Sequence, residues 1–220
     1  NTLWVCLYMP TTLQWRDKGI TLEQDCTWPA QRSTIRLTTG EGDFTLKLRV
    51  PYWATRGFEV LLNGKPVQHH YQPSSYVTIS GHHWTVSDRL EIIMPFTTHI
   101  EYGADKLPAE VASADGTPLK SAWTGVVMYG PLCMTGTNAT TWEQATLNVS
   151  DINAKGKTLV LNNAEVSSLS INGMTFLPDY YRNENSTHYY RLVDSGTTTK
   201  KTKVVDFTEL KSLLDIAGER

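Results

Sequence analysis

The stretch Phe44-Thr45-Leu46-Lys47-Leu48-Arg49-Val50 alternates apolar and polar side chains, and Pro51 follows it. A period of two is typical of a β-strand that buries one face, here the face formed by the four apolar residues. Proline has no N–H to donate to a sheet, so the strand is predicted to end at Pro51. Arg89–Met94, which leads into Pro95, repeats the pattern. Both stretches therefore predict strands of an all-β fold.

Two hairpins are predicted at a distance from each other. Val60–Val67 and Leu169–Phe176 each place an Asn-Gly pair between apolar runs. This pair tolerates the positive φ angles of a type I′ turn and is a strong hairpin signal. The hairpins are separated by roughly the length of one β-sandwich, about 100 residues. A new strand series begins at Ala122–Tyr129, after a stretch interrupted by glycine and proline.

The predicted architecture is therefore all-β, with two tandem antiparallel, jelly-roll-like β-sandwiches. The first is expected over residues 1–103 and the second over residues 104–220, with the boundary between residues 102 and 120. Asp206 and Glu209 form a capping box ahead of an apolar stripe. They predict a short C-terminal helix at about residues 207–217. The first residues, NTLWVCLY, are strand-like rather than a polar tail, so we expect a piece cut from a longer chain.

Composition narrows the classes of function. The 220 residues carry a formal net charge of −2, with 40% hydrophobic and 19% charged residues. A globular chain without a concentrated basic face is not expected to bind nucleic acid or an anionic membrane. No apolar run approaches the roughly 20 residues that span a bilayer.

No metal site, cofactor or catalytic residue is predicted in this chain. Cys6, Cys26 and Cys133 are too few and too widely spaced for a zinc knuckle, and we expect all three to be buried. The histidine pairs His69-His70 and His82-His83 flank a strand-like segment, where adjacent side chains point to opposite faces. The 22 acidic residues single out no carboxylate pair of the kind that glycosidases use.

Aromatic residues offer weak candidates for a sugar-binding surface. Tyr180-Tyr181 and Tyr189-Tyr190 flank a polar loop, and tyrosine rings can stack on sugar rings. The alternative is that one tyrosine of each pair packs inward while the other covers a neighbour. Both interpretations stay open at this point.

Several segments, in the same order along the chain, resemble the C-terminal part of glycoside hydrolase family 127, the β-L-arabinofuranosidase group. They are Leu7–Trp15, the Arg-x-Pro-x-Trp-Ala motif at Arg49–Ala54, the Asn-Gly turn after Val60, the strands from Tyr76 to Pro95, and the Gly-Pro-Leu strand Val126–Leu132. The resemblance covers about residues 3 to 134. It implies a parent enzyme in which an (α/α)₆ barrel, with a cysteine nucleophile in a zinc site, precedes β-sandwiches.

The resemblance implies that this chain is the non-catalytic accessory region of a glycoside hydrolase and is inactive alone. Its expected partners are the helical catalytic domain of the parent chain and a plant-type oligosaccharide. Two alternatives remain: a carbohydrate-binding module that uses exposed aromatic residues, and a self-contained sandwich hydrolase with a hidden carboxylate pair. In the parent enzyme the apolar N-terminal segment is expected to pack against barrel helices. In this chain alone it is expected to fold back on the first sandwich or to be buried in a dimer contact, with Trp4, Tyr8 or Trp15 at its centre. A bacterial periplasmic or secreted location is favoured over the cytoplasm.

Overall fold

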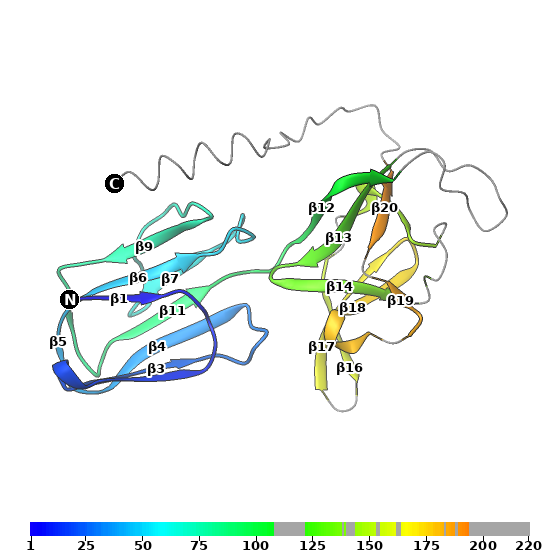
Figure 1. Ribbon diagram of the computed structural model, residues 1–220. Helices are drawn as coiled ribbons and strands as arrows, with labels where there is room; N and C mark the ends of the chain where they lie inside the picture. Colours follow the sequence, from blue (N-terminus) through cyan, green and yellow to red (C-terminus); the bar gives the residue numbers. More distant parts are fainter. Residues whose placement is uncertain are drawn as a thin grey trace.

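The computed structural model describes residues 1–107, 122–137, 139, 144–152, 155–161, 164–182, 184–187 and 189–193. In these ranges the chain is built from strands (Figure 1). The helices found there are single 3₁₀ turns, at Arg16–Lys18, Val149–Asp151 and Asp179–Tyr181. The all-β prediction is therefore confirmed, and the predicted C-terminal helix lies outside the described residues. Within the described residues, no helix is long and apolar enough to cross a membrane.

Two facing sheets form the first half of the chain (Figure 1). The larger has six strands in the order β2 (Thr11–Trp15), β3 (Ile20–Asp25), β4 (Arg32–Thr39), β11 (Arg89–Ile93), β7 (Glu59–Leu62) and β8 (Lys65–Pro66). The smaller has three strands in the order β1 (Thr2–Val5), β6 (Thr45–Val50) and β9 (Ser75–Ile79). A short pair, β5 (Gly42–Asp43) with β10 (His83–Trp84), lies at one end.

The inner faces of these two sheets bury the apolar half of each alternating strand. On β6, Leu46, Leu48 and Val50 are fully buried, while Lys47 and Arg49 between them are only half-buried. Strands β3, β4, β9 and β11 alternate in the same way, and their inward apolar residues belong to one core. The strand predicted before Pro51 is therefore confirmed, as is the one predicted before Pro95.

Both predicted Asn-Gly hairpins are present. Asn63 and Gly64 have φ angles of 51° and 77° between β7 and β8. Asn172 and Gly173 have φ angles of 51° and 76° between β17 (Ala164–Ile171) and β18 (Met174–Pro178). These left-handed angles are the ones that a type I′ turn requires.

Strand β1 corrects the prediction of purely antiparallel sheets, because it pairs with β6 in parallel. It is not a hairpin partner of β6: the chain continues from β1 into β2, which belongs to the other sheet. A strand that enters from outside a hairpin is free to run in either direction. A second parallel pair joins β15 (Thr146–Asn148) to β20 (Tyr190–Val193).

The second half forms one nine-stranded sheet in the described residues. Its main path is β15, β20, β13 (Ala122–Tyr129), β14 (Leu132–Thr137), β18, β17 and β16 (Lys157–Leu161). Strand β12 (Thr98–Leu107) pairs with β13, and β19 (Ser186–Thr187) pairs with β14. The sheet curls around a core that includes Met134, Leu147, Phe176 and Tyr190, all fully buried.

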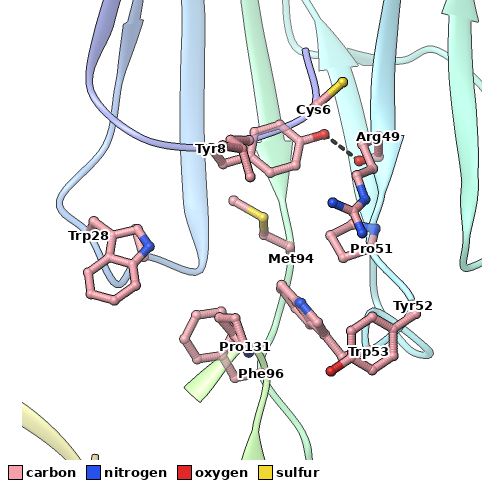
Figure 2. A pocket seen from close by; sticks show the side chains of 12 residues that line it. Cys6, Tyr8, Trp28, Arg49, Pro51, Tyr52, Trp53, Met94, Phe96 and Pro131 are labelled. Carbon is pink, nitrogen blue, oxygen red and sulfur yellow. Dashed lines mark hydrogen bonds between the residues drawn. The ribbon is translucent and has the colours of Figure 1, made fainter. Parts of the chain in front are cut away.

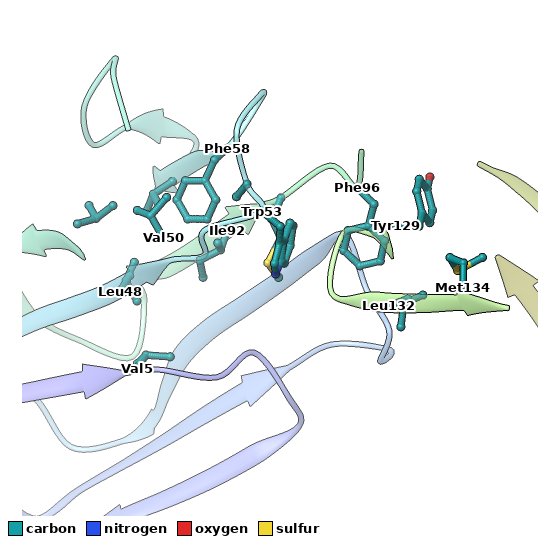
Figure 3. Packing of buried hydrophobic residues seen from close by; sticks show 14 of the residues in the cluster. Val5, Leu48, Val50, Trp53, Phe58, Ile92, Phe96, Tyr129, Leu132 and Met134 are labelled. Carbon is teal, nitrogen blue, oxygen red and sulfur yellow. The ribbon is translucent and has the colours of Figure 1, made fainter. Parts of the chain in front are cut away.

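The two halves share one continuous core (Figure 3). Trp53 of the first half contacts Phe96 edge-on at 5.3 Å, and Phe96 contacts Tyr129 of the second half at 5.5 Å. The Gly130 N–H donates to the carbonyl of Thr97 at 3.0 Å. The predicted division at residue 103/104 falls inside β12, and the two-domain division stays a prediction.

Candidate functional site

The outer face of the six-stranded sheet carries charges of both signs that pair with one another. Arg36 on β4 bonds to Glu23 on β3 at 2.8 Å. Arg32 on β4 lies 3.5 Å from Glu91 on β11. Such pairs on an exposed sheet contribute little to stability and keep the surface hydrated.

The outer face of the three-stranded sheet is different, and we call Trp4, Lys47 and Tyr76 the aromatic face. Because β1 follows the period of two, Val5 points into the core and Trp4 points out. Trp4 contacts Tyr76 edge-on at 4.8 Å, and Lys47 Nζ lies 4.4 Å from the centroid of Trp4. Trp4 remains 50% exposed and Tyr76 41% exposed. In the described residues, no carboxylate lies within 4.0 Å of Lys47.

The three N-terminal aromatic candidates, Trp4, Tyr8 and Trp15, lie in different environments. Trp4 is exposed. Tyr8 is half-buried, its hydroxyl donates to the carbonyl of Arg49 at 2.6 Å, and burial raises its pKa. Trp15 is half-buried near the other end of the sandwich, where it contacts Phe44 at 5.6 Å. The segment folds back onto the first sandwich through β1, which was one of the two predicted outcomes.

The cysteines correct a prediction, because Cys6 is exposed and the other two are half-buried. Cys6 follows Val5 at the end of β1, so the alternation turns its side chain outward, 3.6 Å from the Tyr76 hydroxyl. Burial, followed by the nearby carboxylate of Asp25, raises the pKa of Cys26. All three are free thiols.

A hollow of about 270 Å³ lies where the first half of the chain passes into the second (Figure 2). Its lining residues come from four separate segments and the turn before β14. They are Cys6, Leu7, Tyr8, Trp28, Ala30, Arg49, Pro51, Tyr52, Trp53, Met94, Phe96 and Pro131. Figure 2 shows Trp28 and Tyr52 on opposite sides, with Met94 between them.

Arg49 is the one charged residue in this lining. Among the described residues its guanidinium has no carboxylate within 4.0 Å. Glu101 lies outside the lining but accepts a hydrogen bond from the hydroxyl of Tyr52, which belongs to it. Burial, followed by this bond, raises the pKa of Tyr52 to about 12. Tyr52 therefore stays a neutral phenol at any physiological pH.

The four tyrosine candidates take different positions. Tyr190 is fully buried against Phe176, and Tyr189 beside it is exposed, as the inward-packing alternative predicted. Tyr180 is 56% exposed and its ring lies 4.9 Å from that of the half-buried Tyr181. Tyr180 also approaches Trp28 of the hollow, with the ring centroids 6.4 Å apart.

The histidine pairs do not come together. His69 and His70 lie in an exposed loop. His82 Nε2 lies 3.2 Å from Asp88, and His83 Nδ1 lies 2.9 Å from Asp43. In the part of the chain that the structure describes, no three His, Cys, Asp or Glu residues gather as a metal site would require.

The hollow was not anticipated from the sequence. Arg49 and Tyr52 stand inside the Arg-x-Pro-x-Trp-Ala motif, which was noted as a resemblance and not as a site. Trp28 carried no signal, since its role depends on segments distant in the chain.

Residues 2–96 match the family described as "Beta-L-arabinofuranosidase, GH127 middle domain". No curated protein matches the chain. A solved glycoside hydrolase matches with a TM-score of 0.64 and 18% identity, over 86% of this chain and 36% of its own. A GH127 β-arabinofuranosidase matches with a TM-score of 0.62 and 19% identity, over 87% of this chain and 35% of its own. A GH127 β-L-arabinofuranosidase from Geobacillus stearothermophilus matches with a TM-score of 0.53 and 16% identity, over 87% and 34%.

The fold and these matches show a β-rich chain that is similar to the non-catalytic region of GH127 enzymes. Residues 2–96, which form the first sandwich, match the model of a GH127 middle domain, and the resemblance to family 127 noted in the sequence is confirmed. At identities below 20%, the solved structures establish the fold alone. This chain spans about a third of their length.

Proposed function

We propose that the chain supports the helical catalytic barrel of a β-L-arabinofuranosidase-like enzyme, and that the barrel docks on the aromatic face. The observation that carries the proposal is the difference between the two outer faces of one sandwich. One face pairs its charges, whereas the other leaves Trp4 and Tyr76 half in water beside Lys47, which contacts the Trp4 ring and has no ion pair with a carboxylate in the described part of the chain. Tryptophan and tyrosine are enriched among the residues that dominate binding energy at interfaces.

The chemistry of this face indicates what should cover it. Trp4 and Tyr76 offer two rings nearly at right angles, and both stay partly open to an apolar partner surface. Lys47 favours a carboxylate on the partner, because the described residues of this chain supply none. The barrel surface is therefore expected to present apolar side chains around an acidic residue.

The role proposed is structural. The resemblance to family 127 puts the nucleophile, its zinc site and the acid/base in the barrel, so this chain alone should not turn over arabinofuranosides. A glycosidase needs two catalytic groups held against the same bond. The chain would contribute by holding the barrel in its active shape.

The test is reconstitution from separate parts. The chain and the helical domain of its parent enzyme are purified separately, mixed, and analysed by sedimentation velocity. Replacing Trp4 with Ser should weaken the complex at least about tenfold, an energy of about 1.4 kcal/mol. The matched control is Val86→Ser, because Val86 is also an exposed apolar residue but belongs to the turn between β10 and β11 and not to the three strands of the aromatic face.

Two outcomes would contradict the proposal. One is a complex that Trp4→Ser and Val86→Ser weaken equally. The other is a chain that forms a stable dimer with itself through Trp4 and does not bind the helical domain.

A further inference from the structure

The hollow has two aromatic walls that remain open to water. Trp28 is 55% exposed and Tyr52 is 46% exposed, and they stand on opposite sides of Met94 (Figure 2). Exposed rings that line a concave surface fit ligands with a flat apolar side, such as the C–H face of a sugar ring. At about 270 Å³, the hollow is near the lower end of small-molecule sites, which begin at roughly 300 Å³. It is large enough for one sugar ring and too small for a folded partner.

The charge in the hollow adds a second requirement. Arg49 lines it as a lone cation, and the described residues offer its guanidinium no carboxylate. A guanidinium is a planar fork that binds a carboxylate through two parallel hydrogen bonds. A hollow that holds the Arg49 guanidinium and the rings of Trp28 and Tyr52 favours a ligand with both a ring and a negative charge.

An aromatic series leads away from the hollow. The Trp28 ring is followed by Tyr180 at 6.4 Å, and Tyr180 by Tyr181 at 4.9 Å. The series runs from the first half of the chain onto the second, because Tyr180 and Tyr181 belong to the 3₁₀ turn after β18. A chain of sugar units extending from the hollow would therefore meet one ring after another.

From this arrangement we propose that the hollow binds an acidic oligosaccharide, with one uronosyl ring stacked on Trp28 and its carboxylate on Arg49. The next sugar units lie along Tyr180 and Tyr181. The hollow and the aromatic face share no residue, although Cys6 of the hollow lies 3.6 Å from Tyr76. The proposal for the hollow uses none of Trp4, Lys47 and Tyr76, so it can be tested on the chain alone. An apolar side chain of another domain is the competing occupant, but it would leave Arg49 without a counter-charge.

Isothermal titration of the purified chain with trigalacturonic acid tests the proposal, with neutral arabinotriose as the comparison. Trigalacturonic acid should bind one per chain, and arabinotriose at least about tenfold more weakly. Arg49→Gln and Trp28→Ala should each reduce the affinity for trigalacturonic acid at least about tenfold. Trp28→Phe should retain most of it, because a ring remains. Tyr180→Ala should reduce the affinity for the trisaccharide and leave the affinity for the monosaccharide, galacturonic acid, unchanged.

Matched controls are Arg56→Gln and Tyr102→Ala, an exposed arginine and an exposed tyrosine outside the hollow. Both control variants should bind trigalacturonic acid with the affinity of the unaltered chain. Because Tyr8 bonds to the backbone of Arg49 and not to its side chain, Arg49→Gln should keep the fold. Equal binding of the neutral and the acidic trisaccharide, unchanged binding by Arg49→Gln, or no binding of trigalacturonic acid at millimolar concentration would each overturn the proposal.

Discussion

The first sandwich has two outer faces that differ in their chemistry. On the inner side of both sheets the strands place apolar residues in one core. On the six-stranded sheet the outward positions are charges that pair, such as Arg36 with Glu23. On the three-stranded sheet they are Trp4, Lys47 and Tyr76. The comparison teaches that a strand pattern defines the inner face alone, and that the chemistry of the outer positions tells whether water or a partner belongs there.

The largest effect should come from the inner side of the three-stranded sheet. Leu48 is fully buried, so Leu48→Ala should lower the free energy of unfolding by about 2–5 kcal/mol. Lys47→Ala, at the preceding residue of the same strand, loses a contact with Trp4 and should cost no more than about 1 kcal/mol. Urea denaturation of both variants checks this. Equal losses would mean that β6 does not separate a core face from an outer face.

A smaller effect on the free energy of unfolding, dependent on pH, is expected from Asp88, which lies in the turn before β11. Burial alone would raise the pKa of Asp88, but bonds from Asn63 and Thr85, with His82 nearby, outweigh it and hold the pKa below the usual value. The ionised form therefore stabilises the fold. This contribution is present above the ordinary pKa of about 3.9 and is lost as the pH falls through the lower pKa of the folded state.

Asp88→Asn should accordingly lower the free energy of unfolding by about 1–3 kcal/mol at pH 7 and by much less near pH 2. Urea titrations at a series of pH values measure the difference. A loss of the same size at both pH values would show that the charge of Asp88 is not what stabilises this turn.

The aromatic face should matter less for the stability of the isolated chain than for binding. Trp4 is half exposed, and Trp4→Ser loses its contacts with Tyr76 and Lys47, which should cost about 0.5–1.5 kcal/mol. The midpoint of urea unfolding provides the measurement. A loss as large as that of Leu48→Ala would place Trp4 in the core of the fold and remove the argument for a docking surface.

The smallest effect is expected on the six-stranded outer face. Arg36→Ala breaks an exposed pair with Glu23 and should change the free energy of unfolding by no more than about 1 kcal/mol. Added salt should shrink the difference further, since it screens exposed charges. A difference that persists at 1 M salt would contradict this account of the face.

Local patterns predicted the elements of the fold, and non-local contacts explain what they missed. The Asn63-Gly64 turn and the end of β6 before Pro51 depend on backbone preferences of a few residues. The parallel pairing of β1 with β6 joins segments about 40 residues apart, and no local pattern reports it.

The candidate site was harder to predict for the same reason. The Arg-x-Pro-x-Trp-Ala motif becomes understandable in the structure: Pro51 ends the strand, Tyr52 points out, and Trp53 points into the shared core. The contact of Trp28 with Tyr180 joins the two halves of the chain. The sequence singled out Tyr180 as part of a tyrosine pair, but no local pattern pointed to Trp28.

The most direct test of the central claim is the accessibility of Trp4 and Tyr76 with and without the helical domain of the parent enzyme. Hydroxyl-radical footprinting with mass spectrometry reads the oxidation of each side chain separately. The account predicts that both are oxidised readily in the isolated chain and are protected in the complex, while Val86 stays equally reactive in both. Trp4 and Tyr76 that remain as reactive in the complex as in the isolated chain would contradict it.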